Sequence, residues 1–205
     1  MGNIAEAAAE EIGANVLLTR AGAYFHDVGK LSRPEYYIEN MAGGPSPHDR
    51  ISPMMSSMIL TSHTKDGVEL AAQYGVPSPL RRIIVEHHGT SLVKYFHDKA
   101  SKEAEGTGEP VREGMFRYRG PKPRSPESGI VMLADSVESA ARSIEDASPS
   151  RLEKLVRAIV QERLEDGQLD ESRMNITDIR RVERSLVRSL LAIAHPRIRY
   201  PGAIA

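Results

Sequence analysis

Apolar residues recur along this chain at helical intervals, and no segment shows the apolar–polar alternation typical of a half-buried strand. An alanine-rich stretch from Ile4 to Ile12 predicts a first helix, which Gly13 ends. A second helix is predicted from Val16 to Phe25, before Gly29 breaks the pattern. The amino-terminal part of the chain is therefore expected to form two short helices joined by a turn.

Serine–proline pairs mark the starts of most later helices, because serine caps a helix well and proline fits its first turn. The pairs are Ser52-Pro53, Ser78-Pro79, Ser125-Pro126 and Ser148-Pro149. Thr177 is expected to cap the last helix, which should run to about His195-Pro196. The fold class predicted from these patterns is all-α, a single helical bundle over residues 1–205.

Segments rich in glycine, proline and charge are expected to be loops. Arg33-Pro34 and Gly43–Pro47 flank a short aromatic segment. The stretch from Glu105 to Arg124 is predicted to be an exposed loop, and the charge run from Lys99 to Glu113 a solvated segment rather than a binding patch. The chemistry of the chain should therefore lie on the helices and at their ends.

Composition narrows the class of protein. The 205 residues suffice for one domain with a proper core, and 27 basic against 28 acidic residues argue against a broad face for a nucleic-acid polymer. The sequence has no cysteine and therefore no disulfide, which suits a reducing compartment. The sequence shows neither a membrane-spanning stretch of roughly 18 apolar residues nor a signal peptide at its start.

Six ionisable residues occur in an order that suits a metal centre: His26, Asp27, His63, His87, His88 and Asp135. Nitrogen and oxygen donors without thiolate favour iron, manganese or a similar divalent ion. Neighbouring helical residues point about 100° apart, so Asp27 could bridge two ions while His26 binds one. His87 and His88 could share an ion only near a helix end, and Gly89 permits the necessary turn.

Two divalent ions bridged by a carboxylate can clamp the attacking and leaving oxygens of a phosphoester. Lys30 lies one turn beyond Asp27 and could contact a phosphate oxygen, although a lysine that complements the helix dipole is an equal alternative. Glu86 could orient a ligand histidine or could be an ordinary surface glutamate. The sequence therefore indicates phosphoester chemistry, with these two roles left open.

Several motifs resemble the cytoplasmic HD domain of the bacterial seven-transmembrane HD proteins, which hydrolyse cyclic di-AMP to the linear dinucleotide. They are Ala23–Lys30, Glu86–Thr90, Phe116–Pro123 and Met132–Glu138, and the resemblance extends to the closing His195–Pro201. It implies an HD-domain bundle, a cytoplasmic location, a cyclic dinucleotide substrate and two divalent ions. A membrane portion like that of the family is absent from this chain, and a homodimer is left open.

The resemblance also implies roles for individual residues. Asp27 would bridge the ions, His26 and Asp135 would bind the first, and His63, His87 and His88 would bind the second. Asp27 and Lys30 are the expected catalytic residues. Lys30, His48 and Arg117 are expected to contact the substrate, whereas His97 is expected to be a surface or packing residue.

One ligand of the family pattern is missing. The pattern has a further histidine just upstream of Met1, so the chain is expected to be truncated relative to the family and to hold its first ion weakly. The leading hypothesis is a metal-dependent phosphodiesterase acting on cyclic di-AMP. The alternatives are an HD phosphohydrolase acting on a mononucleotide and a catalytically weak HD domain that binds a nucleotide or a partner.

Overall fold

The computed structural model describes residues 1–41, 45–105, 110–144 and 148–194, and the regular secondary structure of this part of the chain is helical apart from one isolated bridge between Leu92 and Arg117. The α-helices are α1 Gly2–Ile12, α2 Val16–Phe25, α3 Pro53–Gln73, α4 Ser78–Glu86, α5 Lys94–Ala104, α6 Pro126–Arg142, α7 Pro149–Glu165 and α8 Ile176–Ala194. Short 3-10 helices are η1 Val28–Ser32, η2 Pro34–Tyr36, η3 Ile38–Asn40, η4 Pro47–Arg50 and η5 Glu113–Phe116. The predicted all-α fold is confirmed.

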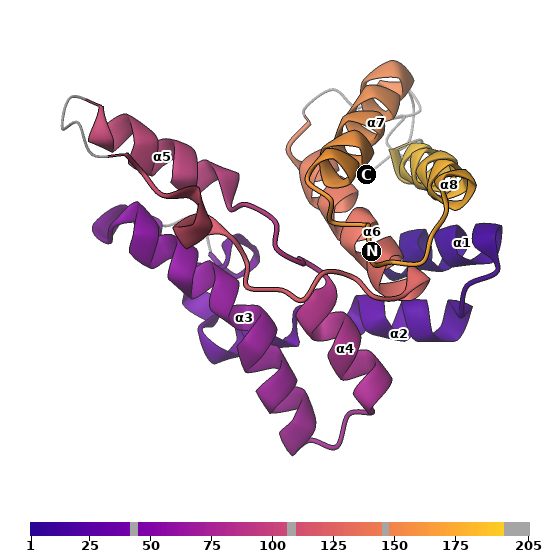
Figure 1. Ribbon diagram of the computed structural model, residues 1–205, viewed down its shortest axis with the longest axis horizontal. Coiled ribbons are helices and arrows are strands. Elements are labelled where there is room, and N and C mark those ends of the chain that lie inside the picture. The colour runs from indigo at the N-terminus through magenta and orange to yellow at the C-terminus, as the bar shows by residue number, and fades with distance from the viewer. Residues whose placement is uncertain (42–44, 106–109, 145–147, 195–205) are drawn as a thin grey trace, which may run out of the picture.

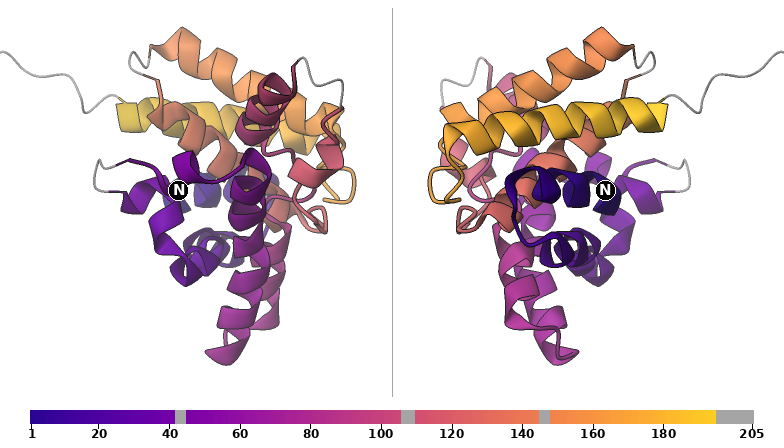
Figure 2. Two further views of the ribbon diagram at one scale, coloured as in Figure 1. Left: turned by 90° about the vertical axis from the view of Figure 1, so that its left-hand side faces the viewer. Right: turned by 90° about the vertical axis from the view of Figure 1, so that its right-hand side faces the viewer.

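The helices form two packed groups that meet near the middle of the molecule (Figure 1). Helix α1 packs against α2, α6 and α8, and α7 packs against α6 and α8, whereas α3 packs against η1, α4 and α5. Helices α3 and α4 extend side by side away from the other helices (Figure 2). No helix in the described ranges has both the length and the apolar character to cross a bilayer.

The hydrophobic core lies between α1, α2, α6, α7 and α8. The core includes Ile4 from α1, Leu133 from α6, Val156 from α7 and Leu186 from α8, all almost fully buried. Helix α6 is buried along most of its first three turns, which is why its apolar run Ile130–Ala134 shows little amphipathic character. Asp135 follows this run directly, so the core fixes the helix that carries it.

The serine–proline pairs locate the helix starts, but their caps vary. Ser52 and Ser125 each accept a hydrogen bond from the backbone N–H three residues later, whereas Ser148 makes no such bond. The prediction that Thr177 caps the last helix is wrong. Asn175 caps it instead, because its side-chain oxygen accepts from the N–H groups of Thr177 and Asp178.

The segment predicted as an exposed loop is more structured than expected. The charge run from Lys99 begins inside α5, and residues 106–109 of the run lie outside the described residues. Beyond them, Phe116 is buried and its carbonyl accepts from the Val93 N–H at 2.8 Å. Tyr118 N–H donates to the Ser91 carbonyl at 3.0 Å, so this segment is fixed against the chain just after α4.

Close backbone contact at two glycines lets η1 lie against α3. A Cβ atom added at Gly29 would lie 1.9 Å from the His63 carbonyl oxygen and 2.5 Å from the Gly67 backbone nitrogen. At Gly67 an added Cβ would lie 2.8 Å from a methyl group of Ile84. Because the atoms facing Gly29 are backbone atoms, they cannot move aside cheaply, and the contact sets the spacing between Asp27 and His63.

We expect Gly29→Ala to lower the free energy of unfolding by at least about 2 kcal/mol, because the added methyl group overpacks a backbone contact. Chemical denaturation measures the effect. Gly114→Ala is the matched control, since no atom lies within 4 Å of its Cβ position. Equal stability of Gly29→Ala and the parent protein would contradict the close packing of η1 on α3.

Candidate metal centre

The six predicted ligands come together from four parts of the fold. His26 and Asp27 directly follow α2, His63 lies in the middle of α3, His87 and His88 directly follow α4, and Asp135 lies on α6. Their donor atoms form two groups, within each of which all the atoms lie within 4.8 Å of one another. The groups are Asp27, His63, His87 and His88, and His26, Asp27 and Asp135. The predicted convergence is therefore confirmed, and Asp27 belongs to both groups.

Backbone carbonyls orient three of the histidine rings. The Nδ1 atoms of His26, His63 and His87 lie 2.9, 2.6 and 2.7 Å from the carbonyl oxygens three residues earlier. A carbonyl can only accept, so each Nδ1 carries the hydrogen and each neutral ring presents the lone pair of Nε2 to the centre. The helical turn before each histidine therefore fixes it in the tautomer that a metal ligand needs.

In the first of these groups, acceptor atoms face one another without a donor. His63 Nε2 lies 3.2 Å from His87 Nε2, and Asp27 Oδ1 lies 3.3 Å from the former and 3.7 Å from the latter. Burial lowers the pKa of His63, and burial together with the charges of His26 and His63 lowers the pKa of His87 to about 3. Asp27 Oδ1 is buried and has no hydrogen-bond partner among the described residues. A divalent cation would satisfy all three atoms.

The group around His26 can be satisfied in another way. His26 Nε2 lies 3.1 Å from Asp27 Oδ2 and 3.5 Å from Asp135 Oδ1. Burial alone would lower the pKa of His26, but its contacts with the Asp135 and Asp27 carboxylates outweigh burial and raise it to about 10. A proton on Nε2 would therefore offset part of the charge of the two carboxylates without a metal, although the same three side chains can also serve as metal ligands.

Lys30 is tied to the same carboxylate. Its Nζ lies 2.7 Å from Asp27 Oδ2 and 2.8 Å from Glu39 Oε1. Burial opposes the charge of Lys30, but the charge of Asp27 outweighs burial and raises the pKa. Lys30 therefore lies beside the centre and carries a positive charge.

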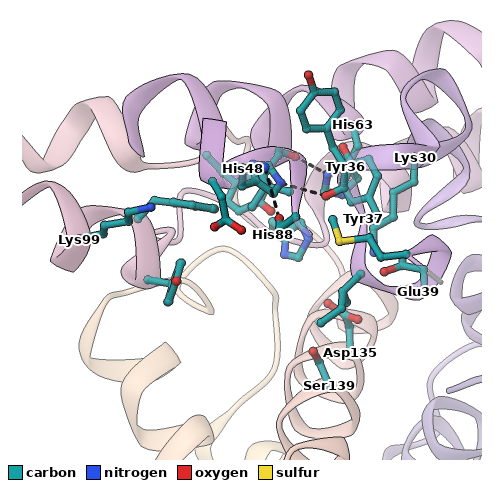
Figure 3. A pocket seen from close by; sticks show the side chains of 18 residues that line it. Lys30, Tyr36, Tyr37, Glu39, His48, His63, His88, Lys99, Asp135 and Ser139 are labelled. Carbon is teal, nitrogen blue, oxygen red and sulfur yellow. Dashed lines mark hydrogen bonds and ion pairs between the residues drawn. The ribbon is translucent and has the colours of Figure 1, made fainter. Parts of the chain in front are cut away.

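A cavity of about 430 Å³ opens beside these groups (Figure 3). His63, His88, Asp135 and Lys30 all contribute to its lining. Its walls carry the aromatic residues Tyr36, Tyr37, Tyr95, Phe96 and Tyr118. Tyr118 stacks on His88 with ring centroids 4.2 Å apart, a contact that sequence reasoning missed although it lay within a recognised motif.

His48 also lines the cavity, as expected. It is buried, its Nε2 lies 2.9 Å from the Tyr36 carbonyl, and its ring packs against Phe96. His97 is half-buried and its ring contacts Phe116 edge-on, which agrees with a packing role.

Arg117 does not line this cavity, which counts against its predicted contact with substrate. Its guanidinium donates two hydrogen bonds to the carboxylate of Asp166, at 2.8 and 2.9 Å, and a third to Glu113 at 2.7 Å. It lines a different cavity, of about 690 Å³, which also borders α3 and α4.

Glu86 is buried rather than a surface residue, and its carboxylate accepts a hydrogen bond from the Arg124 N–H. Backbone carbonyls, and not Glu86, orient the rings of His26, His63 and His87.

A family comparison decides the class of fold. Residues 1–140 match the model of the HD domain. The chain belongs to the HD-domain family. This HD domain is 46% identical over 201 residues to the cyclic-di-AMP phosphodiesterase PgpH of Bacillus subtilis and 42% identical over 199 residues to PgpH of Listeria monocytogenes. These matches cover 98% and 97% of the chain, which spans only 28% and 27% of the length of those relatives.

The HD domain also resembles a solved structure along nearly its whole length. The HD domain of the L. monocytogenes phosphodiesterase PgpH, determined in complex with cyclic-di-AMP, superposes with a TM-score of 0.89 at 41% identity. The match covers 94% of this chain and 88% of that one.

We expect NMR of the metal-free HD domain to show that His26 and His87 have opposite protonation states. With a pKa of about 10, His26 should remain protonated at pH 8, whereas His87, with a pKa of about 3, should remain neutral at pH 5. Ring nitrogen chemical shifts in single His→Asn variants assign the two signals. A neutral His26 at pH 7 would contradict its pairing with Asp27 and Asp135.

The same shifts predict how stability depends on pH. The folded-state pKa of His26 lies above the ordinary 6.5, so its contribution is complete below about pH 6.5 and is lost as the pH rises towards 10. The pKa of His87 lies below 6.5, so the folded state favours the neutral ring, and the free energy of unfolding falls as the pH drops from 6.5 towards 3. The His26→Asn variant should lack the alkaline loss.

Proposed function

We propose that this HD domain is a metal-dependent phosphodiesterase that hydrolyses cyclic di-AMP to linear pApA. The observation that carries the proposal is the pair of donor groups sharing Asp27 beside an aromatic-walled cavity. The similarity to PgpH supports this substrate, because the PgpH proteins are phosphodiesterases of cyclic-di-AMP. A cytoplasmic location, implied by the resemblance, is part of the same proposal.

The residues present fit two divalent ions. Asp27, His63, His87 and His88 would hold one ion, and His26, Asp27 and Asp135 the other. Iron and manganese suit this set of imidazole and carboxylate donors. Bound ions would supply a nucleophilic hydroxide at neutral pH and would stabilise charge on the phosphoryl oxygens.

The side chains around the centre have their own tasks. Tyr36 and Tyr95, unlike the buried Tyr37, offer faces on which adenine bases can stack, a contact that contributes about 1–3 kcal/mol per base in nucleic-acid complexes. Lys30 is near enough to the centre to donate to a phosphate oxygen once substrate competes with Asp27 and Glu39 for it.

One observation favours the second candidate function, an HD domain that binds a nucleotide with little catalysis. His26 Nε2 lies 3.1 Å from Asp27 and 3.5 Å from Asp135, so a proton there could offset part of the carboxylate charge in place of an ion. Hydrolysis by two ions would then fail, whereas binding at the other group would persist.

Incubation of the purified chain with cyclic di-AMP and Mn²⁺, followed by chromatography of the products, tests the function. We expect linear pApA to accumulate and a chelator to stop the reaction. Hydrolysis of a mononucleotide but not of cyclic di-AMP would replace the proposal by the mononucleotide alternative. Binding of cyclic di-AMP without turnover would favour the weak catalytic domain.

We predict that Asp27→Ala abolishes turnover more completely than Lys30→Ala. Asp27 is shared by both donor groups, so its loss removes a ligand from each. Lys30 offers only a single charge to a phosphate oxygen, so its loss should lower turnover by roughly ten- to a thousandfold. Turnover at saturating Mn²⁺ measures the difference. The exposed residues Asp98 and Lys65, each changed to alanine, are matched controls. Retained activity of Asp27→Ala would refute the assignment of Asp27 as a ligand of the metal centre.

We predict that the two ions bind with different affinities. The group of Asp27, His63, His87 and His88 has four protein ligands and no competing proton, so it should bind Mn²⁺ more tightly than the three-ligand group. His63→Ala should therefore remove the tight phase of a Mn²⁺ titration followed by EPR, and Asp135→Asn only the weak phase.

The start of α1 lies beside the three-ligand group. The Met1 amine is 2.9 Å from Glu138 Oε1, three residues beyond Asp135. A histidine-bearing segment added before Met1 should therefore strengthen the weak phase and raise turnover. Equal affinities and equal turnover with and without that segment would contradict the partition of ligands.

A further inference from the structure

A residue beyond the matched family segment holds the turn that carries His87 and His88. Gln168 lies between α7 and α8 and is completely buried. Its Oε1 accepts from the Thr90 N–H at 2.8 Å, and its Nε2 donates to Thr90 Oγ1 at 2.9 Å and to Asp166 Oδ2 at 2.8 Å. The family model matches only residues 1–140, so this contact comes from a part of the chain outside it.

Arg117 holds the same turn from another side. One of its guanidinium nitrogens donates to the Thr90 carbonyl at 2.8 Å, and the group also makes the two hydrogen bonds to Asp166. Asp166 thus accepts from both Arg117 and Gln168. Thr90 has its N–H, its carbonyl and its hydroxyl all engaged by this clamp of Gln168, Asp166 and Arg117.

The turn is built to approach Gln168 closely. Gly89 has a φ of 52°, a conformation that favours glycine. A Cβ atom added there would lie 2.3 Å from Gln168 Oε1 and 3.0 Å from the end of Met132. Gly89 directly follows His88, so the hydrogen bonds of Gln168 to Thr90 fix the chain two residues beyond His88.

His88 depends on this backbone more than the other ligands do. His26, His63 and His87 each have a ring nitrogen fixed by a backbone carbonyl, whereas no hydrogen bond to the His88 ring occurs among the described residues. Its ring is held by contacts with the rings of Tyr118, His87 and His63, none of them a hydrogen bond, and by its own main chain. Displacement of the turn would therefore move His88 first.

We propose that Gln168, with Asp166 and Arg117, is a positioning residue that holds His88 in place as a metal ligand. The inference rests on the proposed metal centre. It gives a role there to the segment between α7 and α8, which contributes none of the proposed metal ligands. Partners that orient metal ligands are typically worth ten- to a hundredfold in metal affinity.

The test compares Mn²⁺ dissociation constants of the full chain, measured by EPR well below the melting temperature of each variant. Gln168→Leu removes the hydrogen bonds at similar volume and should weaken the tight phase roughly ten- to a hundredfold. Gln161→Leu is the matched control, because this exposed glutamine of α7 bonds only to Glu165 among the described residues and should leave binding unchanged. Faster hydrogen exchange of the Thr90 amide in Gln168→Leu should accompany the weaker binding.

A second variant guards against loss of folding. Asp166→Asn alters a partly exposed pair and should weaken the tight phase by a smaller factor than Gln168→Leu. Unchanged Mn²⁺ affinity in a folded Gln168→Leu variant would overturn the positioning role and leave the proposed function standing. If Gln168→Leu does not fold, unchanged Mn²⁺ affinity in Asp166→Asn would overturn the positioning role instead. Absence of Mn²⁺ binding by the parent chain would instead refute the metal centre, and the clamp with it.

Discussion

The position of the Asp27 carboxylate is the constraint on which the rest of the site depends. Its Oδ1 faces His63 and His87, while its Oδ2 faces His26 and Lys30. This sharing requires the end of α2 to lie against the middle of α3 and the end of α4. The backbone contact between Gly29 and Gly67 makes that approach sterically feasible, so the packing of η1 and the geometry of the centre are one requirement.

The two donor groups differ in how their charge can be balanced, and this difference governs their chemistry. Buried polar atoms without a partner are costly. Around His26 a proton on Nε2 would offset part of the charge of Asp27 and Asp135, whereas between His63 and His87 two lone pairs and a carboxylate oxygen face one another. A cation between these atoms would remove that cost. Metal binding should therefore be coupled to folding more strongly in the group of Asp27, His63, His87 and His88 than in the group of His26, Asp27 and Asp135.

The sequence predicted the fold and the convergence of the six candidate ligands because both leave local signals. Helical spacing and serine–proline pairs located the helices, and the His-Asp and His-His-Gly steps located four of the candidate ligands at helix ends. Long-range partners leave no such signal. Nothing in the spacing of Arg117 indicates that it bonds to Asp166, and a lone Gln168 looks like any polar residue of a loop. The cap at Asn175 rather than Thr177 shows that even local signals compete within two residues.

The charges around the cavity argue that binding of the proposed substrate, and not only its proposed hydrolysis, would depend on metal. The charged side chains of its lining comprise the carboxylates of Glu39, Asp49 and Asp135 against the amines of Lys30 and Lys99. Lys30 is moreover already paired with Asp27 and Glu39. A cyclic dinucleotide carries two negative phosphodiesters, which such a lining would repel. Two divalent ions would reverse the sign of the local field, so a metal-free domain would be a poor binder of the proposed substrate as well as a poor catalyst.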